Sequence, residues 1–265
     1  MKKAKILLSY FLISVFSFGA CSQDVEVAQK DKFHLYLLAG QSNMAGRGMV
    51  ESQDREIHDR VLTLRKNGTW GHAIEPIHFD KRSAGVGPGR SFGIAMAEKD
   101  PSVTIGLIPC AVGGSSVTFW KAGKMYPATN SYPYDDTIER VKRAMKDGTL
   151  KGIIWHQGES DATPTGSENY EGELSELFLR FRAEFKNPDL PILVGQLGQF
   201  ESRPWDDSWT KIDAAHRSVA DAGPSIVFVT SDGLTCKPDN VHFDSASMRA
   251  FGKRYAEAYG KLISE

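Results

Sequence analysis

The chain has 265 residues, of which 41% are hydrophobic and 25% are charged, and its formal net charge is −1. This length and composition suit one globular domain with a full hydrophobic core, and they exclude a disordered or collagen-like chain. A chain so close to neutral lacks the basic surface that holds nucleic acid, so we expect no nucleic-acid partner.

The first twenty residues have the charge and hydropathy order of an export signal. Three lysines within the first five residues precede an uncharged, largely apolar stretch over residues 6–18, which is shorter than the about 20 residues of a membrane-spanning helix. The sequence FGAC, ending at Cys21, resembles the bacterial lipoprotein box, although Phe18 stands where that box usually has leucine. We therefore expect residues 1–20 to be a lipoprotein signal peptide, Cys21 to be lipidated, and the protein to be exported to the periplasm or cell surface. Plain secretion is the alternative.

The next segment is small and polar. Residues 22–31 have the sequence SQDVEVAQKD, which together with Cys21 predicts a tether over residues 21–31 before a single domain over residues 32–265. Residues 1–20 contain three lysines and no acid, and their removal leaves 29 Lys and Arg against 33 Asp and Glu. An acidic protein is not attracted to anionic lipid, so we expect membrane contact only through the N-terminal lipid.

Strand and helix patterns alternate through the rest of the chain. Short apolar runs rich in Ile, Val and Leu predict five buried strands, at residues 33–38, 103–109, 152–155, 192–196 and 226–230. Helical patterns lie between and after them, at residues 92–99, 134–146, 170–185, 209–222 and 245–263. This alternation predicts an α/β fold, a five-stranded parallel sheet with helices on both faces.

Polar segments follow these strands, at the edge of a parallel sheet where binding sites form. They are GQSNM from Gly40, CAVGGSS from Cys110, HQGES from His156, GQF from Gly198, and PDNVHFD from Pro238. Such loops are common singly, and Ser42 or Asn43 alone would suit a helix cap. Five of them at one sheet edge indicate a functional site.

The residue types in these segments fit acyl transfer. Ser42 is the candidate nucleophile, and a serine hydroxyl needs an adjacent base. Asp239 and His242, spaced D-x-x-H, supply the acid that orients the base and the base itself. An oxyanion needs hydrogen-bond donors that are already in place. Suitable donors are the amide of Ser42, a glycine amide from Gly113 or Gly114, and the side chain of Gln157.

The motifs GQSNM, AVGGSS, WHQGES and DNVHFD, in this order, resemble those of the SGNH/GDSL hydrolases. They are most similar to the branch that contains the sialic acid O-acetylesterases and the acetylxylan esterases of carbohydrate esterase family 6. The resemblance covers residues 33–260. It implies a flavodoxin-like three-layer α/β/α sandwich and removal of acetyl groups from sugar hydroxyls without a metal or another cofactor.

The resemblance also implies roles for individual residues. Ser42 matches the nucleophile and His242 the base, and Gly114 is favoured over Gly113 as the oxyanion donor of the second motif. The wider superfamily has G-x-N-D as its third motif, with asparagine as a donor, and this chain has HQGE, so Gln157 takes that place. Glu159 is then either the acid of the triad or a second acid that orients His242 together with Asp239. As the acid of the triad, Asp239 ranks slightly ahead of Glu159.

Four further residues are less determined by the sequence. Asn43 either contacts substrate or tethers neighbouring loops, and Arg90, in a glycine-rich turn without the features of a phosphate loop, is a candidate for the wall of the site. Trp120 suits either a platform for a sugar ring or the core. Cys110 is expected as a buried free thiol, and a disulfide with Cys236 is the less favoured alternative.

These observations predict a carbohydrate O-acetylesterase of the acetylxylan esterase type, with an acetylated oligosaccharide or polysaccharide as its partner. A sialate O-acetylesterase is the first alternative. An inactive carbohydrate-binding domain is the second, although a D-x-x-H segment opposite a serine turn has no use in a pure binding protein. A lipase is disfavoured because the chain has no long apolar lid segment.

Overall fold

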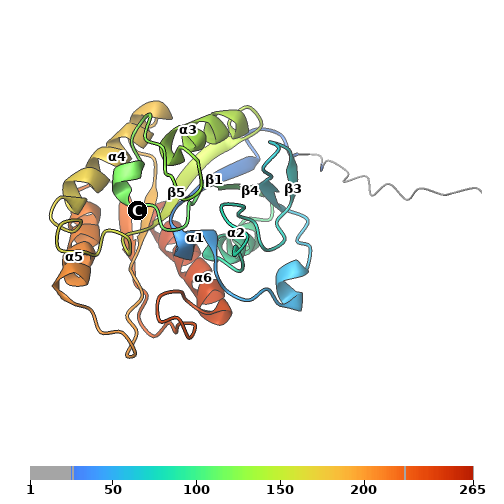
Figure 1. The fold of residues 1–265 in the computed structure, drawn as a ribbon. Coiled ribbons are helices and arrows are strands. Elements are labelled where there is room, and N and C mark those ends of the chain that lie inside the picture. Colours follow the sequence, from blue (N-terminus) through green and yellow to red (C-terminus); the bar gives the residue numbers. More distant parts are fainter. Residues whose placement is uncertain (1–24, 26, 224, 265) are drawn as a thin grey trace, which may run out of the picture.

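The computed structural model of the protein describes residues 25, 27–223 and 225–264, and they form a sheet between two layers of helices (Figure 1). The seven strands have the order β3-β2-β4-β1-β5-β6-β7. Their bounds are β1 Phe33–Gly40, β2 Val61–Leu64, β3 Trp70–His72, β4 Thr104–Pro109, β5 Thr149–His156, β6 Ile192–Gly195 and β7 Ile226–Val229. The helices are α1 Ser42–Ala45, α2 Pro88–Lys99, α3 Pro133–Ala144, α4 Tyr170–Glu184, α5 Asp207–Ala222 and α6 Ser245–Leu262, with 3₁₀ turns at Ser52–Arg55 and Val117–Phe119.

The five strands predicted from the sequence are five adjacent parallel strands of this sheet, β4-β1-β5-β6-β7, with β7 at one edge. The prediction of five strands is wrong in number, because β2 and β3 extend the sheet beyond β4. β2 is parallel to β4, and β3 is antiparallel to β2. The sheet is therefore mixed, with one hairpin at its edge.

Side chains of β1 point alternately to the two faces of the sheet, as the period of a strand requires. Phe33, Leu35 and Leu37 belong to a core with α3, α4 and α5, whereas Tyr36 and Leu38 belong to a second core with α2 and α6. All five side chains are buried. This two-sided burial explains why the strand has a nearly continuous apolar sequence.

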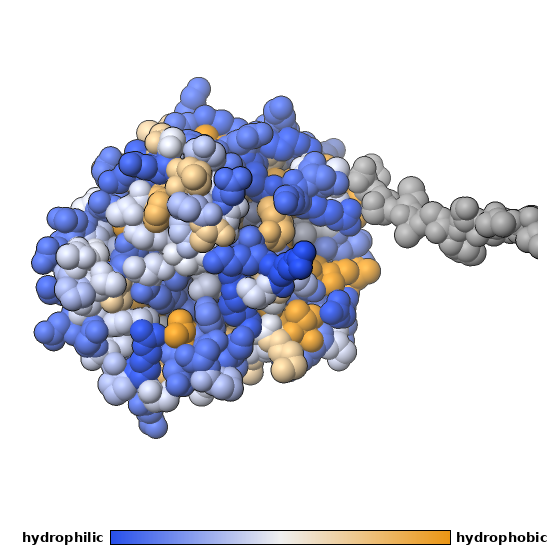
Figure 2. Space-filling view, viewed as in Figure 1, coloured by the Kyte–Doolittle hydropathy of each residue, from blue (hydrophilic) through white to orange (hydrophobic). Residues whose placement is uncertain are grey.

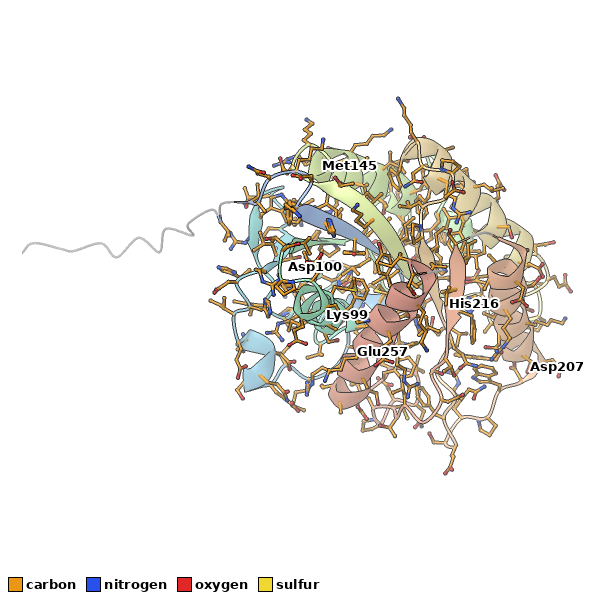
Figure 3. All side chains as sticks on the ribbon, turned by 180° about the vertical axis from the view of Figure 1, so that it is seen from behind. Lys99, Asp100, Met145, Asp207, His216 and Glu257 are labelled. Atoms are coloured by element: carbon orange, nitrogen blue, oxygen red, sulfur yellow. The ribbon has the colours of Figure 1, made fainter. Side chains whose placement is uncertain are left out.

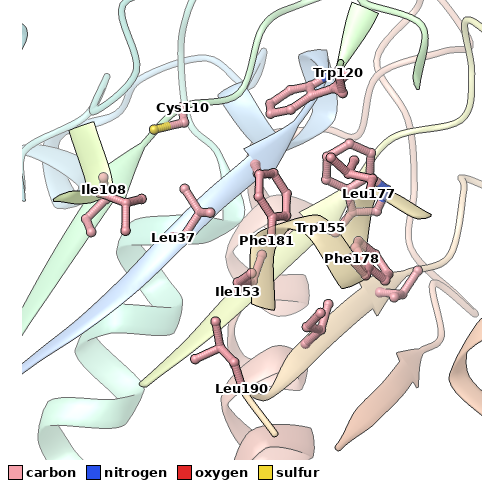
Figure 4. Packing of buried hydrophobic residues seen from close by; sticks show 14 of the residues in the cluster. Leu37, Ile108, Cys110, Trp120, Ile153, Trp155, Leu177, Phe178, Phe181 and Leu190 are labelled. Atoms are coloured by element: carbon pink, nitrogen blue, oxygen red, sulfur yellow. The ribbon is translucent and has the colours of Figure 1, made fainter. Parts of the chain in front are cut away.

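The core beneath α3, α4 and α5 is rich in aromatic rings (Figure 4). Trp120 packs edge-on against Trp155, with ring centroids 5.0 Å apart, and Phe181 of α4 lies 6.5 Å from Trp120. On the opposite face, α2 and α6 lie side by side (Figure 3). There the Lys99 ammonium, at the end of α2, donates a 2.7 Å hydrogen bond to the carbonyl of Ala256 in α6.

The predicted tether is not free over its whole length. Val25, Val27 and Ala28 pack against the core beneath α3, α4 and α5, and the carbonyl of Lys30 accepts a hydrogen bond from the Thr149 hydroxyl. The packed part of the chain thus begins before residue 32, because these apolar side chains cover the first core. The predicted signal peptide and Cys21 lie outside the described residues.

The structure describes the state of both cysteines of the domain and the hydropathy of its helices. Cys110 and Cys236 are both free thiols, and Cys110 is buried, as expected. Burial raises the pKa of the Cys110 thiol, which keeps it neutral. In the part of the chain that the structure describes, no helix combines the length and the apolar character needed to cross a membrane.

The strand register brings the polar segments together at one edge. Leu38 pairs with Pro109 of β4, and Gly40 pairs with His156 of β5, so the segments after these three strands start at neighbouring positions. Gly40 has a φ of +126°, and a Cβ there would lie 2.1 Å from the carbonyl oxygen of His156. Only glycine allows the first strand to leave the sheet this close to β5.

A buried carboxyl group predicts a pH dependence of stability. Burial raises the pKa of Glu75 to about 8, although its carboxylate accepts hydrogen bonds from the amides of Ile77 and Gly87. This pKa lies above the value of about 4.3 in an unfolded chain. The contribution of the protonated group to stability is therefore fully present below about pH 4.3. The contribution is lost as pH rises through about 8.

We expect the free energy of unfolding of the wild type to fall relative to that of Glu75→Gln between pH 6.5 and 8, by at most about 1.4 kcal/mol per pH unit. The buried histidines His78 and His216 have pKa values that burial lowers to about 4 and about 3, against about 6.5 in an unfolded chain. They add a rise of stability with pH in the lower part of this window, and both proteins share that rise. Urea unfolding at four pH values measures the effect, and equal slopes in both proteins would contradict it.

Candidate active site

Ser42 is the first residue of α1, a single helical turn directly after β1. The turn is held by Gln41, whose amide donates to the carbonyl of His156 and whose carbonyl accepts from the amides of Met44 and Ala45. Ser42 is 7% exposed, so its hydroxyl is placed in a largely dry environment yet remains accessible. The turn that the sequence also suits as a simple cap thus presents a serine at the edge of the sheet.

His242 reaches Ser42 from the loop between β7 and α6. Its Nε2 lies 3.0 Å from the Ser42 hydroxyl oxygen, and its Nδ1 lies 2.9 Å from Oδ2 of Asp239. The second carboxylate oxygen of Asp239 accepts from the amides of Val241 and His242, at 3.0 and 2.9 Å. The D-x-x-H spacing therefore closes a tight loop in which the same carboxylate holds both the backbone and the ring of the histidine.

The charge state of Asp239 fixes the roles of the two ring nitrogens. Burial raises the pKa of Asp239, but the hydrogen bonds from the backbone and ring of His242 and from the Val241 amide outweigh it, and the pKa falls to about 2. At neutral pH this carboxylate can only accept a hydrogen bond, so Nδ1 of His242 carries the proton. Nε2 is then free to accept the proton of the Ser42 hydroxyl. Nucleophile, base and orienting acid are thus connected as Ser42, His242 and Asp239.

The loop after β4, residues 110–116, contains the two glycines predicted as oxyanion donors, and we call it the oxyanion loop. Among the described residues, no protein group accepts a hydrogen bond from the amide of Ser42 or of Gly114. The Gly113 amide, in contrast, donates to Oδ2 of Asp80 at 2.8 Å. Gly113 is therefore wrong as an oxyanion donor, and Ser42 and Gly114 are the two amides that remain available.

The predicted role of Gln157 also needs correction. Its Nε2 is fully buried and donates to Oε1 of Gln41, to the carbonyl of Ser115 and to Oδ2 of Asp161, the first two at 3.2 and 3.1 Å. An amide nitrogen has only two hydrogens, so protein acceptors already occupy this donor. Gln157 instead links the ends of β1, β4 and β5, and it positions the turn of Ser42 without facing an oxyanion.

Glu159 does not contact His242, so it is not the acid of the triad. Its Oε1 accepts a 2.6 Å hydrogen bond from Nδ2 of Asn43, and the ring of His156 lies 3.6 Å away. Burial raises the pKa of Glu159, but the adjacent His156 ring and the Asn43 amide lower it more, so the net shift is downward. Glu159 is therefore an ionised carboxylate, and the side chain of Asn43 lies between it and the loop that carries His242.

Asn43 is a tether between loops, and its side chain is too buried to bind substrate. Its Nδ2 donates to the carbonyl of Val241 at 3.1 Å, and its Oδ1 accepts from the amide of Phe243 at 3.2 Å. Asn43 thus holds both neighbours of His242 against the turn that carries Ser42, and Glu159 holds Asn43. Glu159 orients the base only indirectly, through this clamp.

Arg90 and Trp120, both predicted as candidates for the substrate wall, lie elsewhere. Arg90 is buried in α2, where its guanidinium donates to the carbonyls of Ala73 and Glu56. Trp120 is 0% exposed, and its ring nitrogen donates to the Ser115 hydroxyl. Arg90 therefore joins two loops and Trp120 fills the core, because each side chain satisfies its polar groups inside the protein.

Several residues of the site were not found from the sequence. Asp80 accepts from Gly113 and forms a buried 2.7 Å ion pair with Arg47, and Lys237 donates to the carbonyl of Arg47 while lying 3.9 Å from Asp239. These contacts join the oxyanion loop, the Ser42 turn and the His242 loop. They connect residues far apart in the chain, so no local pattern marks them.

The residues described contain no group of three or more His, Cys, Asp and Glu side chains arranged to hold a metal ion.

Gly113→Ala tests the importance of this support. A Cβ at residue 113 would lie 2.2 Å from Nη2 of Arg47 and 2.7 Å from Oδ2 of Asp80. The ion pair or the loop must then move, and a displacement near 1 Å at a catalytic group costs about 10²-fold in rate. We expect kcat on a small acetate ester to fall by about that factor while the fold is retained by circular dichroism. An unchanged kcat would show that the pair does not set the loop.

Comparison with known proteins identifies the family of the chain. A family model described as carbohydrate esterase, sialic acid-specific acetylesterase, matches residues 32–261. A probable carbohydrate esterase of Arabidopsis thaliana is 30% identical over an alignment 246 residues long, and the match covers 85% of this chain and 89% of that protein.

Solved structures show the same fold. An Arabidopsis thaliana protein structure has a TM-score of 0.76 and 28% identity, and covers 86% of this chain and 98% of its own. The protein NanS has a TM-score of 0.70 at 17% identity, with 90% and 99% covered. A carbohydrate acetylesterase from Xanthomonas citri has a TM-score of 0.69 at 22% identity, and the match covers 87% of this chain and 57% of that longer one. With the family model matched over nearly its whole described length, the chain belongs to the carbohydrate esterases of the sialic acid-specific acetylesterase family.

Proposed function

We propose that the protein removes acetyl groups from sugar hydroxyls through an acetyl-Ser42 intermediate. The observation behind the proposal is the hydrogen-bonded chain from the Ser42 hydroxyl through His242 to Asp239. The amides of Ser42 and Gly114, which donate to no protein group in the described part of the chain, accompany it at the same edge of the sheet. This set contains the nucleophile, base, orienting acid and oxyanion donors that acyl transfer requires.

In the first half of the reaction, Nε2 of His242 takes the proton of the Ser42 hydroxyl as the oxygen attacks the acetyl carbonyl carbon. The carbonyl oxygen becomes an oxyanion, which the amides of Ser42 and Gly114 stabilise. Asp239 stabilises the imidazolium that forms. His242 then gives its proton to the sugar oxygen, the carbon–oxygen bond to the sugar breaks, and the alcohol leaves an acetyl-Ser42 ester.

In the second half, water attacks that ester while Nε2 of His242 accepts one of its protons. The second tetrahedral intermediate uses the same two amides, and it collapses when His242 returns the proton to the Ser42 oxygen. Acetic acid leaves and ionises in water to acetate, and the free enzyme is restored. Both halves use the same groups, so every triad residue affects both.

An acetylated sugar is favoured over a lipid ester by the family and by the surface. The matched family and the Arabidopsis relative are described as carbohydrate esterases. The face in Figure 2 is mainly hydrophilic, with apolar residues in small separate groups, whereas a fatty acyl chain needs a continuous apolar surface. We place acetylated xylan-type sugars first, because removal of residues 1–20 would leave 29 Lys and Arg against 33 Asp and Glu, and a net negative charge disfavours the anionic sialic acid.

Deacetylation of sialic acid is the second candidate, and the description of the matched family favours it. Lys81 offers a test, since its ammonium lies 3.8 Å from the position of a Cβ on Gly114 and so close to the oxyanion loop. A sialic acid carboxylate would pair with this cation. Tyr126 bounds the same space, with its hydroxyl 2.9 Å from that position.

A substrate panel decides between the candidates. We expect kcat/KM for release of acetate from acetylated xylooligosaccharides to be at least tenfold above that for O-acetylated sialic acid. The rate on 4-nitrophenyl butyrate should be less than a tenth of the rate on 4-nitrophenyl acetate. Lys81→Met should leave the xylooligosaccharide rate within about twofold. A preference for sialic acid that Lys81→Met abolishes would establish the second candidate, and no turnover of any ester, with sugar binding retained, would establish an inactive binding domain.

We also propose that the protein is exported and anchored by a lipid on Cys21. The support is the sequence of residues 1–21, with lysines before an apolar stretch and small residues before the cysteine. The test is incorporation of labelled palmitate by the full chain in a bacterial host, with Cys21→Ser as the control. Labelling of both proteins, or of neither, would contradict the anchor.

A further inference from the structure

The space beside the Cα atom of Gly114 is bounded by the side chain of Tyr126. Gly114 is exposed and has a φ of +83°, and a Cβ built on it would lie 2.9 Å from the Tyr126 hydroxyl oxygen. Two covalent bonds separate this Cβ position from the Gly114 amide nitrogen, so the hydroxyl oxygen lies no more than about 6 Å from that nitrogen. Tyr126 is therefore a neighbour of the amide that we assign to the oxyanion.

Tyr126 is held in place by its backbone and its ring. It belongs to the loop over residues 121–132, which leads to α3 and is green in Figure 1. Its amide donates a 2.7 Å hydrogen bond to the carbonyl of Ser131, and its ring packs edge-on against the ring of Phe119, with centroids 4.9 Å apart. A phenylalanine at this position could make both contacts, so the hydroxyl is not needed to place the ring.

The loop that carries Tyr126 is tied to α3 on both sides of this residue. The amide of Gly123 donates to Oδ2 of Asp135 at 2.7 Å, and the amide of Tyr132 donates to Oδ2 of Asp136 at 2.9 Å. A loop that is already fixed loses little conformational freedom when a ligand binds. The Tyr126 hydroxyl is thus preorganised beside the oxyanion loop.

The hydroxyl itself is free to bind a ligand. Among the described residues no group forms a hydrogen bond with it, and its oxygen is open to solvent. Burial of the half-buried Tyr126 raises the pKa of the hydroxyl, which therefore stays protonated. A protonated tyrosine hydroxyl can both donate and accept a hydrogen bond. Water satisfies it in the free protein, and a substrate group that forms the same hydrogen bonds can replace that water.

The position of the hydroxyl relates it to the sugar and not to the acetyl group. During acyl transfer the acetyl carbonyl oxygen approaches the Gly114 amide, so the sugar that carries the ester comes close to Tyr126. A hydroxyl on the neighbouring carbon of the sugar is only a few covalent bonds from that carbonyl oxygen. It can donate to the tyrosine oxygen or accept its proton, whereas an acetylated oxygen cannot donate.

We infer that Tyr126 forms a hydrogen bond with a free hydroxyl beside the acetyl ester on the sugar, and so selects singly acetylated sugars over fully acetylated ones. The inference rests on the proposed function and names the part of the sugar that this site recognises. A site that pairs with a substrate hydroxyl rejects an analogue without that hydroxyl, because its own polar group is then left unpaired.

Lys81 bounds the same space but has a different role. Its ammonium lies 3.8 Å from the Cβ position on Gly114. An ammonium only donates hydrogen bonds and is strongly hydrated, so water replaces it at a neutral sugar. Tyr126 reads the hydroxyl pattern, and the effect of Lys81 is confined to an anionic sugar.

The test compares Tyr126→Phe with the wild type on esters with and without free hydroxyls. The substrates are singly and fully acetylated methyl xyloside, singly and fully acetylated methyl glycoside of N-acetylneuraminic acid, and 4-nitrophenyl acetate. The sugar with the higher wild-type kcat/KM decides. We expect Tyr126→Phe to lower kcat/KM on its singly acetylated form by about fivefold or more, as for loss of one uncharged hydrogen bond. The fully acetylated form and 4-nitrophenyl acetate should change by less than about twofold.

Tyr132→Phe is the matched control, because it removes a hydroxyl from the same loop, on a side chain that is 43% exposed. It should leave all these rates within about twofold. Equal losses for Tyr126→Phe on every substrate would mean that the hydroxyl supports the oxyanion loop, and would overturn the inference. No loss on the singly acetylated sugar would overturn it as well.

Binding separates this inference from the proposed function. In the Ser42→Ala protein, Tyr126→Phe should raise the Kd for the singly acetylated sugar by about fivefold or more, measured by ligand-observed NMR titration. If the wild type hydrolyses no sugar ester but this rise is found, the proposed function falls and the role of Tyr126 stands. If the wild type hydrolyses the singly acetylated sugar and Tyr126→Phe matches it, the role of Tyr126 falls and the function stands. Neither turnover nor binding of any of these sugars would overturn both.

Discussion

Ser42→Ala is expected to lower kcat on 4-nitrophenyl acetate by about 10³-fold or more, since loss of a triad nucleophile removes the covalent path and leaves only the oxyanion donors and binding. Among the described residues the hydroxyl hydrogen-bonds to Nε2 of His242 at 3.0 Å, so its removal should leave the fold and its thermal midpoint nearly unchanged. The measurement is release of 4-nitrophenol at pH 7–8 by the two proteins side by side.

A matched control is Ser91→Ala. Ser91 is a buried serine of α2 whose hydroxyl donates to the carbonyl of Pro88, away from the triad. Its replacement should leave kcat within about twofold. A Ser42→Ala protein that keeps more than a tenth of the wild-type rate would show that Ser42 is not the nucleophile.

Asp239→Asn is expected to lower kcat by about 10²–10³-fold. An asparagine side chain keeps the size of the carboxylate but does not stabilise an imidazolium, and it permits the wrong ring tautomer of His242. The Asp239 side chain is 40% exposed, so water replaces part of the lost interaction, and we expect an effect smaller than that of Ser42→Ala. Steady-state kinetics on 4-nitrophenyl acetate measure it.

Glu159→Gln separates the two acids that the sequence left as alternatives. The amide oxygen of glutamine still accepts from Asn43, so the clamp on the His242 loop is retained and kcat should fall by no more than about tenfold. A loss for Glu159→Gln equal to or larger than that for Asp239→Asn would mean that Glu159, and not Asp239, is the acid on which the base depends.

The core of the fold was predictable because its signals are local. Continuous apolar runs mark strands that are buried on both faces, as in β1, and the five predicted strands and five long helices lie where the patterns place them. β2 and β3 were missed because they are short, at Val61–Leu64 and Trp70–His72. Asn67-Gly68 between them is a recognised hairpin signal, and it was the available sign of this edge.

The meeting of Ser42, His242 and Asp239 was predictable for a similar reason, since Ser42 and the D-x-x-H segment each follow a strand. The errors concern residues whose role depends on partners distant in the chain. Gly113 and Gly114 are adjacent, and only the carboxylate of Asp80 shows which amide is occupied. Gln157 has the right amide group, but acceptors from three loops surround it. No sequence spacing reports such contacts.

Covalent labelling tests the central claim most directly. An organophosphate ester such as diethyl 4-nitrophenyl phosphate reacts with a serine only where a base activates it, and leaves a stable phosphoserine ester. After incubation of wild type, Asp239→Asn and Ser42→Ala, peptide mass spectrometry locates the adduct. We predict one adduct, on Ser42, formed rapidly in the wild type, slowly in Asp239→Asn and never in Ser42→Ala. An adduct on another residue, or an active enzyme after full labelling of Ser42, would contradict the account.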